Sequence, residues 1–295
     1  MDALRAAGTA PNRPLAVVNF GDEEGARFGV ACTGSRLLTG AMAPERALAL
    51  TDGDGVAAGE AMRTAGLDVA HVGRDDETLR RVGTFVELHV EQGRGLVDLD
   101  RPVAVASSIW PHGRWRIDLA GEANHAGTTR LADRHDPMLA LATVVQQARS
   151  AAERHDAVAT CGKVRVEPNG VNAIPSHVTA WLDARGAEPG NVRAVVAEVA
   201  AAVTGASVTE ESWTDVTRFD RDLAARLAVL LDDAPVLATG AGHDAGVLAT
   251  AGIPTAMLFV RNPTGVSHSP AEHAELDDCL AGVDALTRVV AELVA

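Results

Sequence analysis

Residues 84–93, TFVELHVEQG, constrain the fold of this chain more than any other stretch. Read as a β-strand, the stretch places Glu87, His89 and Glu91 on one face and, on the other, the apolar side chains Val86, Leu88 and Val90. The apolar face predicts a strand that packs on a core. Because an unpaired buried charge costs several kcal/mol, the polar face needs solvent, ion-pair partners or a cation. A metal-lined cleft meets that need, and a solvated edge strand is the alternative.

The composition excludes several classes of function. The chain has 295 residues with 26 Lys and Arg against 40 Asp and Glu, a net charge of −14, and its basic residues form no cluster. This balance argues against nucleic acid or an anionic membrane surface as a partner. No apolar run is long enough for a membrane span, and the start lacks a signal-peptide pattern. Cys32, Cys161 and Cys279 are far apart, which predicts a cytoplasmic protein without disulfides.

The order of the predicted elements indicates an α/β fold in which a second domain interrupts the first. Residues 114–213 read as strand, helix, two strands, helix and strand, the βαββαβ order of a ferredoxin-like domain. We expect this insertion at residues 111–216, and a catalytic domain made of residues 1–110 and 217–295. The catalytic domain would have a mixed sheet.

Acidic residues follow the first predicted strand of the catalytic domain. Residues 15–20 read as a buried strand, residues 21–25 as a turn that contains Glu23 and Glu24, and residues 26–41 as a helix. Open α/β sheets bind ligands at the ends of such strands. Two neighbouring carboxylates repel each other unless a cation or a shared proton separates them. The alternative is an acidic first turn of a helix, which is common.

Three further residues favour a metal site. Glu24, His89 and His268 each lie beside the end of a predicted strand, and their oxygen and nitrogen donors suit zinc or manganese. Glu23 would then lie next to the metal and accept a proton from water. Each residue taken alone is weak evidence, since a single histidine is more often structural or exposed.

Six short motifs connect these residues to a known family. They are GDEEGARF (21–28), FVELHVEQG (85–93), HAGTT (125–129), NAIP (172–175), GAGHDA (240–245) and GVSHSPAEH (265–273). In this order they resemble the hydantoinase/carbamoylase amidases, the binuclear-metal branch that contains allantoate amidohydrolase and N-carbamoyl-L-amino-acid hydrolase. The resemblance runs from residue 14 to the C-terminus. It implies a metallohydrolase catalytic domain, an inserted lid and dimerisation domain, and two divalent metal ions, zinc or manganese.

The resemblance also implies roles for individual residues. Glu23 matches the general base, and the metal ligands matched are Glu24, His89 and His268. His125 matches a residue that reaches the partner subunit's active site and stabilises the oxyanion. The residues matched to substrate binding are Gln92, Asn172, Arg185 and His243. A guanidinium fork such as that of Arg185 is well suited to a substrate carboxylate.

In one respect the sequence departs from the family pattern. The family has an earlier segment with a histidine ligand in an H-x-D motif and an aspartate that bridges both metals, whereas only Asp2 and Asp22 precede Glu23 here. We interpret the sequence as a fragment or mis-started product of a full enzyme. There are two alternatives: the protein is a degenerate paralogue, or another polypeptide completes its site. The sequence as given is expected to bind metal weakly and to have doubtful activity.

The predicted function is metal-dependent hydrolysis of the ureido C–N bond of a small carboxylate substrate. Allantoate is the first choice, with release of ammonia and carbon dioxide, because residues 259–261, 267–273 and 277–278 look closer to the allantoate enzymes. N-carbamoyl-L-amino acids are the alternative substrates. A non-catalytic dimerisation or binding protein is the alternative from another class. We expect a homodimer formed through the inserted domain.

Overall fold

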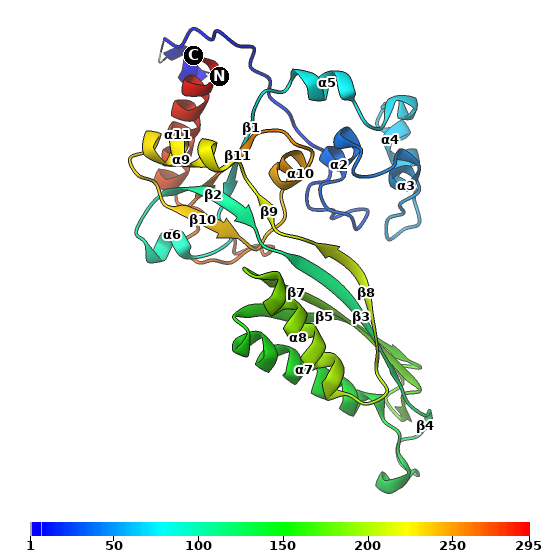
Figure 1. The fold of residues 1–295 in the computed structure, drawn as a ribbon. Coiled ribbons are helices and arrows are strands. Elements are labelled where there is room, and N and C mark those ends of the chain that lie inside the picture. Colours follow the sequence, from blue (N-terminus) through cyan, green and yellow to red (C-terminus); the bar gives the residue numbers. More distant parts are fainter. Residues whose placement is uncertain (1, 7) are drawn as a thin grey trace. The chain divides into compact units, whose positions relative to one another are not determined.

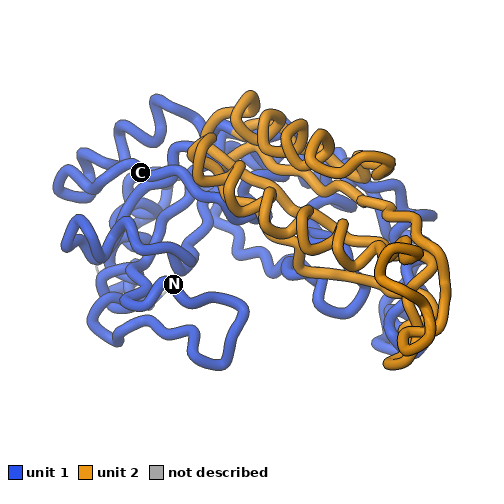
Figure 2. Tube along the Cα trace, turned by 90° about the horizontal axis from the view of Figure 1, so that it is seen from below, with its two compact units in different colours: residues 1–109, 218–295 blue, residues 110–217 orange. Residues whose placement is uncertain are grey.

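A computed structural model describes residues 2–6 and 8–295 of the chain. It separates into two compact units, residues 1–109 with 218–295 (unit 1) and residues 110–217 (unit 2), which Figure 2 shows in different colours. The chain therefore leaves unit 1 once, builds unit 2, and returns to complete unit 1. In the described part of the chain, no helix is both long and apolar enough to cross a membrane.

Unit 1 is built on a mixed sheet (Figure 1). Its strands β1 (Phe85–Val90), β2 (Val103–Ile109), β10 (Val236–Thr239) and β11 (Thr255–Val260) run in the order β1-β11-β2-β10. The pairs β1–β11 and β10–β2 are parallel, and β11–β2 is antiparallel. The short strand β9 (Thr217–Arg218), at the boundary of the units, also pairs with β2. The predicted mixed sheet is confirmed.

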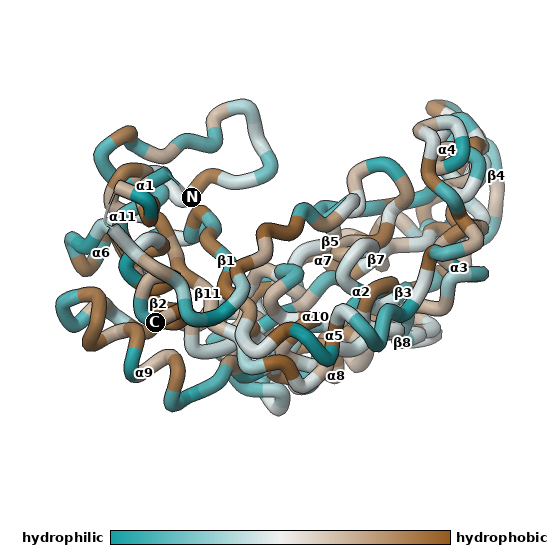
Figure 3. The backbone as a smooth tube through the Cα atoms, turned by 90° about the horizontal axis from the view of Figure 1, so that it is seen from above, coloured by the Kyte–Doolittle hydropathy of each residue, from teal (hydrophilic) through white to brown (hydrophobic). Residues whose placement is uncertain are grey.

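Helices cover both faces of this sheet. The helical elements of unit 1 are α1 (Asp2–Ala6), α2 (Thr33–Thr39), α3 (Pro44–Leu48), α4 (Ala58–Thr64), η1 (Val69–His71), α5 (Asp76–Arg81), α6 (Gly95–Asp98), α9 (Arg221–Leu230), α10 (Asp244–Thr250) and α11 (Leu276–Val294). On one face Leu258 packs with Leu227 of α9 and Val289 of α11. On the other face Phe259 packs with Ala245 of α10. Strand β11 is therefore buried on both sides, which explains its hydrophobic sequence (Figure 3).

The first segment of unit 1 differs from the prediction. Residues 15–20 form an extended segment that is paired with no strand, and Val17 is 85% exposed. The predicted buried strand is wrong, because an apolar sequence forms a strand only where a neighbouring strand takes up its backbone hydrogen bonds. The helix predicted at residues 26–41 is also shorter, since α2 covers only Thr33–Thr39. Turns around Gly25 and Gly29, both with positive φ, occupy its predicted start.

Unit 2 has the predicted βαββαβ order. Its main elements are β3 (His112–Ala120), α7 (Pro137–Arg154), β5 (Ala157–Glu167), β7 (His177–Gly186), α8 (Pro189–Ala202) and β8 (Ser207–Thr214). The strands form an antiparallel sheet in the order β5-β7-β3-β8. A second, two-stranded sheet joins β4 (Asn124–His125) to β6 (Ala173–Ile174), and a turn of 3₁₀-helix, η2, covers Leu131–Asp133.

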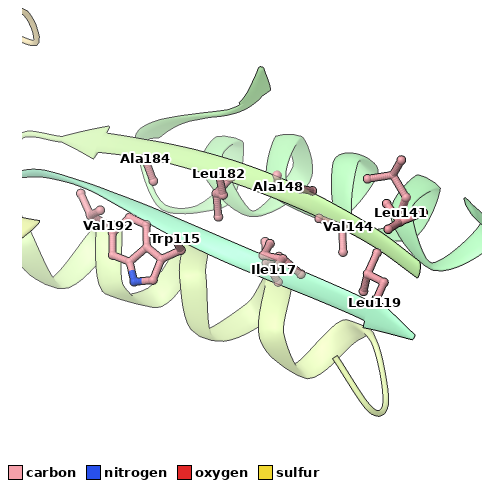
Figure 4. Close-up of a cluster of buried hydrophobic side chains, with 12 residues drawn as sticks. Trp115, Ile117, Leu119, Leu141, Val144, Ala148, Leu182, Ala184 and Val192 are labelled. Atoms are coloured by element: carbon pink, nitrogen blue, oxygen red, sulfur yellow. The ribbon is translucent and has the colours of Figure 1, made fainter. Parts of the chain in front are cut away.

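The core of unit 2 lies between the sheet and its two helices (Figure 4). Alternate residues of β3, Trp115, Ile117 and Leu119, point to this layer, where Val144 of α7 and Val192 of α8 meet them. Full burial of an aliphatic side chain of this size stabilises a fold by about 1.5–3 kcal/mol. The alternation of apolar residues along β3 therefore explains why one face of the sheet packs against α7 and α8.

Candidate metal centre

Strand β1 presents Glu87 and His89 on one face, as its alternation predicted. On the opposite face Val86 and Leu88 pack on the core formed with α9 and α11. The His89 Nδ1 lies 2.7 Å from the carbonyl oxygen of Val90. Nδ1–H therefore donates to this carbonyl, which leaves the lone pair of Nε2 available to a ligand.

The glycine-rich turn after β10 places His243 beside this face. His243 precedes the first residue of α10, and its side chain is 1% exposed. Its ring lies edge-on to that of His89, with centroids 4.4 Å apart. The backbone N–H of Ala245 in the first turn of α10 donates to Glu87 Oε2 at 2.7 Å. These contacts fix the turn against the end of β1.

Glu23 reaches the same place from the turn at residues 21–25. The turn is held by backbone hydrogen bonds from Cys32 to the Glu23 carbonyl oxygen (2.7 Å) and from Gly34 to that of Gly21 (3.0 Å). Gly25 has φ 64°, and a Cβ there would lie 2.5 Å from the carbonyl carbon of Val30. Only glycine fits this turn, which directs Glu23 inward.

The three side chains form a compact cluster. Glu23 Oε1 lies 3.6 Å from His243 Nδ1 and 4.0 Å from His89 Nε2, and one possible ligand atom from each residue falls within 4.8 Å of the others. Two ligands of a tetrahedral zinc ion with bonds of about 2.1 Å lie roughly 3.4 Å apart. Among the described residues, the buried side-chain atoms without a hydrogen-bond partner are Asp22 Oδ2, Glu87 Oε1 and both ring nitrogens of His243. The donor set and its unsatisfied atoms fit a divalent cation.

The electrostatics of the cluster favour the ligand forms of these side chains. The approach of the His243 imidazole lowers the pKa of Glu23 against the opposing effect of burial. Burial lowers the pKa of His243, although Glu23 nearby acts in the other direction. Glu23 is therefore a carboxylate and His243 a neutral imidazole, the forms that bind a metal. Burial raises the pKa of Glu87 to about 8 and also raises that of Asp244, whose Oδ1 accepts a hydrogen bond from Ser35.

The other two predicted metal ligands lie elsewhere. Glu24 pairs with His268, with 3.1 Å between Oε2 and Nε2 and side-chain exposures of 55% and 72%, although its charge still acts on the pKa of His243. His268 has φ 55°, and its backbone N–H donates to Glu272 Oε2 at 3.1 Å. Of the predicted set Glu24, His89 and His268, the structure therefore gathers only His89 with the buried donors. It adds His243, which the motifs had assigned to the substrate.

Gln92 connects the end of β1 to the loop of His268. Gln92 has φ 57°, and its Nε2 donates to Ser267 Oγ at 2.8 Å. The same loop is bounded by Arg261, whose guanidinium donates to both oxygens of the buried Asp278 at 2.9 Å. Arg261 and Asp278, read from the sequence as a sign of allantoate specificity, therefore act as a structural ion pair.

The remaining predicted site residues belong to unit 2. His125 and Asn172 meet through the β4–β6 pair, where the N–H of Ala126 donates to the carbonyl oxygen of Asn172 at 2.9 Å. His125 Nδ1 accepts the N–H groups of Gly127 and Thr128, at 2.9 and 3.2 Å. Its Nε2 must therefore carry the ring hydrogen, which makes the exposed edge of the ring a donor. Arg185 donates to Asp183 through Nε and Nη2, at 2.7 and 3.1 Å.

A carboxylate–imidazole cluster at the end of a parallel strand pair in an α/β sheet is typical of metallohydrolases. Residues 1–292 match peptidase family M20/M25/M40, and the chain belongs to this family. Its members generally depend on a pair of metal ions.

Individual relatives agree with this assignment. The chain is 36% identical to an N-carbamoyl-L-amino acid amidohydrolase of Geobacillus stearothermophilus over 300 residues, which cover 97% of this chain and 73% of the relative. It is 30% identical to the allantoate amidohydrolase of Escherichia coli (strain K12) over 312 residues, covering 99% and 74%. A crystal structure of an amidase of the hydantoinase/carbamoylase family from Burkholderia vietnamiensis superposes with a TM-score of 0.85 at 27% identity, covering 99% and 73%. The predicted resemblance is confirmed, and the chain is a metal-dependent amidohydrolase that acts on C–N bonds.

Proposed function

We propose that the chain hydrolyses the ureido C–N bond of allantoate and releases ammonia and carbon dioxide. The observation that carries this proposal is the partly buried cluster of Glu23, His89 and His243, in which neither ring nitrogen of His243 has a hydrogen-bond partner among the described residues. Relatives named allantoate amidohydrolase in Escherichia coli and Bacillus subtilis, at 30% and 32% identity, support the choice of substrate. N-carbamoyl-L-amino acids are the second candidate substrates, favoured by the relative at 36% identity.

In this proposal the metal is held by the neutral imidazoles of His89 and His243. A divalent metal bound there would lower the pKa of water to about 7 and polarise a carbonyl oxygen. Glu23, kept ionised beside His243, accepts the proton of the attacking water and passes it to the leaving nitrogen. We assign Glu24 and His268 to a more exposed, second metal position, in line with the family's use of two ions.

The residues of unit 2 are proposed to handle the substrate. The Nε2–H of His125 is the group that we assign to the developing oxyanion, in the active site of the partner subunit. Asn172 directly precedes β6, and its carbonyl oxygen accepts the N–H of Ala126, the residue after His125. The substrate-binding set also includes Arg185, whose guanidinium donates to Asp183, and Gln92 of unit 1.

We also propose the division of labour between the units. Residues 1–110 and 217–295 form the catalytic domain, and residues 111–216 form a lid that joins two copies into a homodimer. The edge strand β5, with Val158 and Val164 about half exposed, supports a contact between copies at this edge. The wide spacing of Cys32, Cys161 and Cys279 supports a cytoplasmic location. Sedimentation of the wild type and of Val164→Asp tests the dimer, since a monomeric wild type contradicts it.

Ammonia release from allantoate and from an N-carbamoyl-L-amino acid, with manganese or zinc supplied, tests the function. Allantoate should be turned over, and Glu23→Gln should lower kcat by about 100-fold or more, the usual contribution of a general base. Glu60→Gln, at an exposed carboxylate of α4, is the matched control and should leave the rate unchanged. Turnover of the N-carbamoyl compound alone would establish the second candidate. Metal binding without turnover of either compound would favour a non-catalytic protein.

A further inference from the structure

Three polar side chains of unit 1 form a chain of hydrogen bonds between the end of β1 and the loop of His268. Gln92 Nε2 donates to Ser267 Oγ at 2.8 Å. The Ser267 hydroxyl donates in turn to Glu272 Oε1 at 3.3 Å. The second oxygen, Glu272 Oε2, accepts the backbone N–H of His268 at 3.1 Å. One carboxylate therefore holds both a side chain and the backbone of this loop.

The chemistry of Glu272 fixes the direction of these hydrogen bonds. A carboxylate accepts hydrogen bonds and donates none, whereas a serine hydroxyl has a single hydrogen to donate. Because Glu272 takes the hydrogen of Ser267, Ser267 Oγ can only accept from Gln92. Only the NH₂ end of the Gln92 amide can therefore face Ser267. Its carbonyl oxygen, Gln92 Oε1, must face the other way.

The backbone at both ends of the chain of hydrogen bonds has an unusual conformation. Gln92 has φ 57° and His268 has φ 55°, in the left-handed region that residues other than glycine seldom adopt. Such conformations persist where surrounding contacts hold them in place. Here the side chain of Gln92 is held by Ser267, and the backbone N–H of His268 is held by Glu272. The contacts that orient the amide of Gln92 also fix the loop beside it.

We propose that Glu272 is a positioning residue which, through Ser267, orients Gln92 so that its carbonyl oxygen accepts a ureido N–H of the substrate. The proposal rests on the function proposed above. An amide oxygen attracts an N–H donor and repels a carboxylate, so Gln92 in this orientation suits the ureido end of the substrate. The guanidinium of Arg185 suits the carboxylate end.

Glu272→Gln is the first test of this orientation. An amide at this position keeps the shape and an acceptor for the backbone N–H of His268, but its NH₂ group can donate to Ser267 Oγ. Ser267 is then free to donate to Gln92, whose amide is no longer restricted to one orientation. KM should rise about fivefold, the contribution of roughly one hydrogen bond, with kcat within about twofold. Glu275→Gln, at a nearby exposed carboxylate, is the matched control and should change neither constant.

An exchange of the two residues distinguishes orientation from a purely structural role. Gln92→Glu places two carboxylates against one hydroxyl that has a single hydrogen, and it should lower the melting temperature by about 2–4 °C. Combining it with Glu272→Gln lets Ser267 donate to position 92 and accept from position 272. The double variant should therefore regain at least about half of the lost melting temperature. If Glu272 only holds the backbone of His268, the double variant will melt no higher than Gln92→Glu alone.

Two results would overturn the proposal: an unchanged KM in Glu272→Gln, or a double variant that melts no higher than Gln92→Glu. Melting is measured on the full chain without substrate or metal, so it does not depend on turnover. Recovery of the melting temperature without turnover of allantoate or of the N-carbamoyl compound would reject the proposed function. The orientation of Gln92 by Ser267 and Glu272 would be retained in that case.

Discussion

Glu23 and Glu24 are neighbours in the sequence, yet they form two different kinds of carboxylate–imidazole contact. Glu23 turns inward to His243 and His89, in a cluster where the His243 side chain is 1% exposed. Glu24 turns outward to His268, and both side chains are more than half exposed. The residue types are the same, so the difference lies in their access to water.

Burial decides what each contact can contribute. An exposed ion pair such as Glu24–His268 contributes about 0–1 kcal/mol, because water solvates both groups equally well when they separate. In the inner cluster the His243 side chain is shielded from water, and each of its unsatisfied nitrogens costs about 1–3 kcal/mol. A cation therefore gains more at the buried cluster than at the exposed pair, which makes the buried cluster the tighter of the two proposed metal positions.

The largest expected effect comes from removing His243. His243→Ala should weaken zinc binding by more than about 100-fold and abolish the rise in melting temperature that zinc produces, since saturating ligand at 100 times its Kd stabilises a protein by about 2.7 kcal/mol. Titration calorimetry and thermal melting measure both effects. His273→Ala, at an exposed histidine paired with Glu275, is the control. Tight binding that survives in His243→Ala would make the exposed pair the main site.

A smaller effect is expected from the ion pair that bounds the His268 loop. Arg261→Met leaves Asp278, whose side chain is 4% exposed, without its partner and should lower the free energy of unfolding by about 2 kcal/mol. Arg226→Met breaks an exposed pair with Glu292 and should cost less than about 0.5 kcal/mol. Urea unfolding distinguishes them. Zinc affinity at the buried cluster should stay within about threefold in Arg261→Met; a larger loss would mean that the two regions are coupled.

Removing His268 should have a smaller effect on the affinity for the more tightly bound metal ion. His268→Ala is expected to reduce the affinity for the first equivalent of zinc by less than about tenfold, because this ring contributes no donor to the buried cluster. Binding of a second, weaker equivalent should disappear. Calorimetry resolves the two steps, and loss of the first step in this variant would reverse the comparison.

The smallest effect is the direct coupling between Glu24 and His268. A double-mutant cycle with Glu24→Gln and His268→Ala on the metal-free protein should give about 0.5 kcal/mol at low salt and near pH 6. At 1 M salt, where the Debye length is about 3 Å, the coupling should fall close to zero. A coupling above about 1.5 kcal/mol that persists in salt would show that this pair is shielded from water.

The sequence predicts well those features that depend on neighbouring residues. The alternation of β1 separates Glu87 and His89 from Val86 and Leu88, and the structure confirms both faces. The βαββαβ order of unit 2 follows in the same way from local periodicity. Residues 15–20 were predicted wrongly because their apolar pattern is satisfied only if another strand lies beside them, and pairing is not a local property.

The members of the metal cluster are harder to predict for a related reason. His243 follows Gly242 and His268 lies three residues after Gly265, both in turns or loops of unit 1, and nothing in their immediate sequence shows which is buried. The position of His243 is set by α10 packing beside β1, through the bond from Ala245 to Glu87. Likewise, the turn that carries Glu23 depends on the close approach of Gly25 to Val30 and on backbone hydrogen bonds from residues 32–34. Motifs identify the candidates, whereas tertiary packing decides which of them meet.

The way unit 2 begins and ends has a consequence for folding kinetics. Within unit 2, His112 near its start pairs with Thr214 near its end across β3 and β8. Within unit 1, the chain that leaves after Ile109 and returns at Arg218 is joined by the hydrogen bond from Phe219 to Ser107 at 3.1 Å. Closing a long flexible loop costs entropy that grows with its length. Once unit 2 has folded, its two ends are already adjacent, so unit 1 closes a short connection instead of a long one. We therefore expect unit 2 to fold first and to accelerate the assembly of the sheet that carries the metal centre.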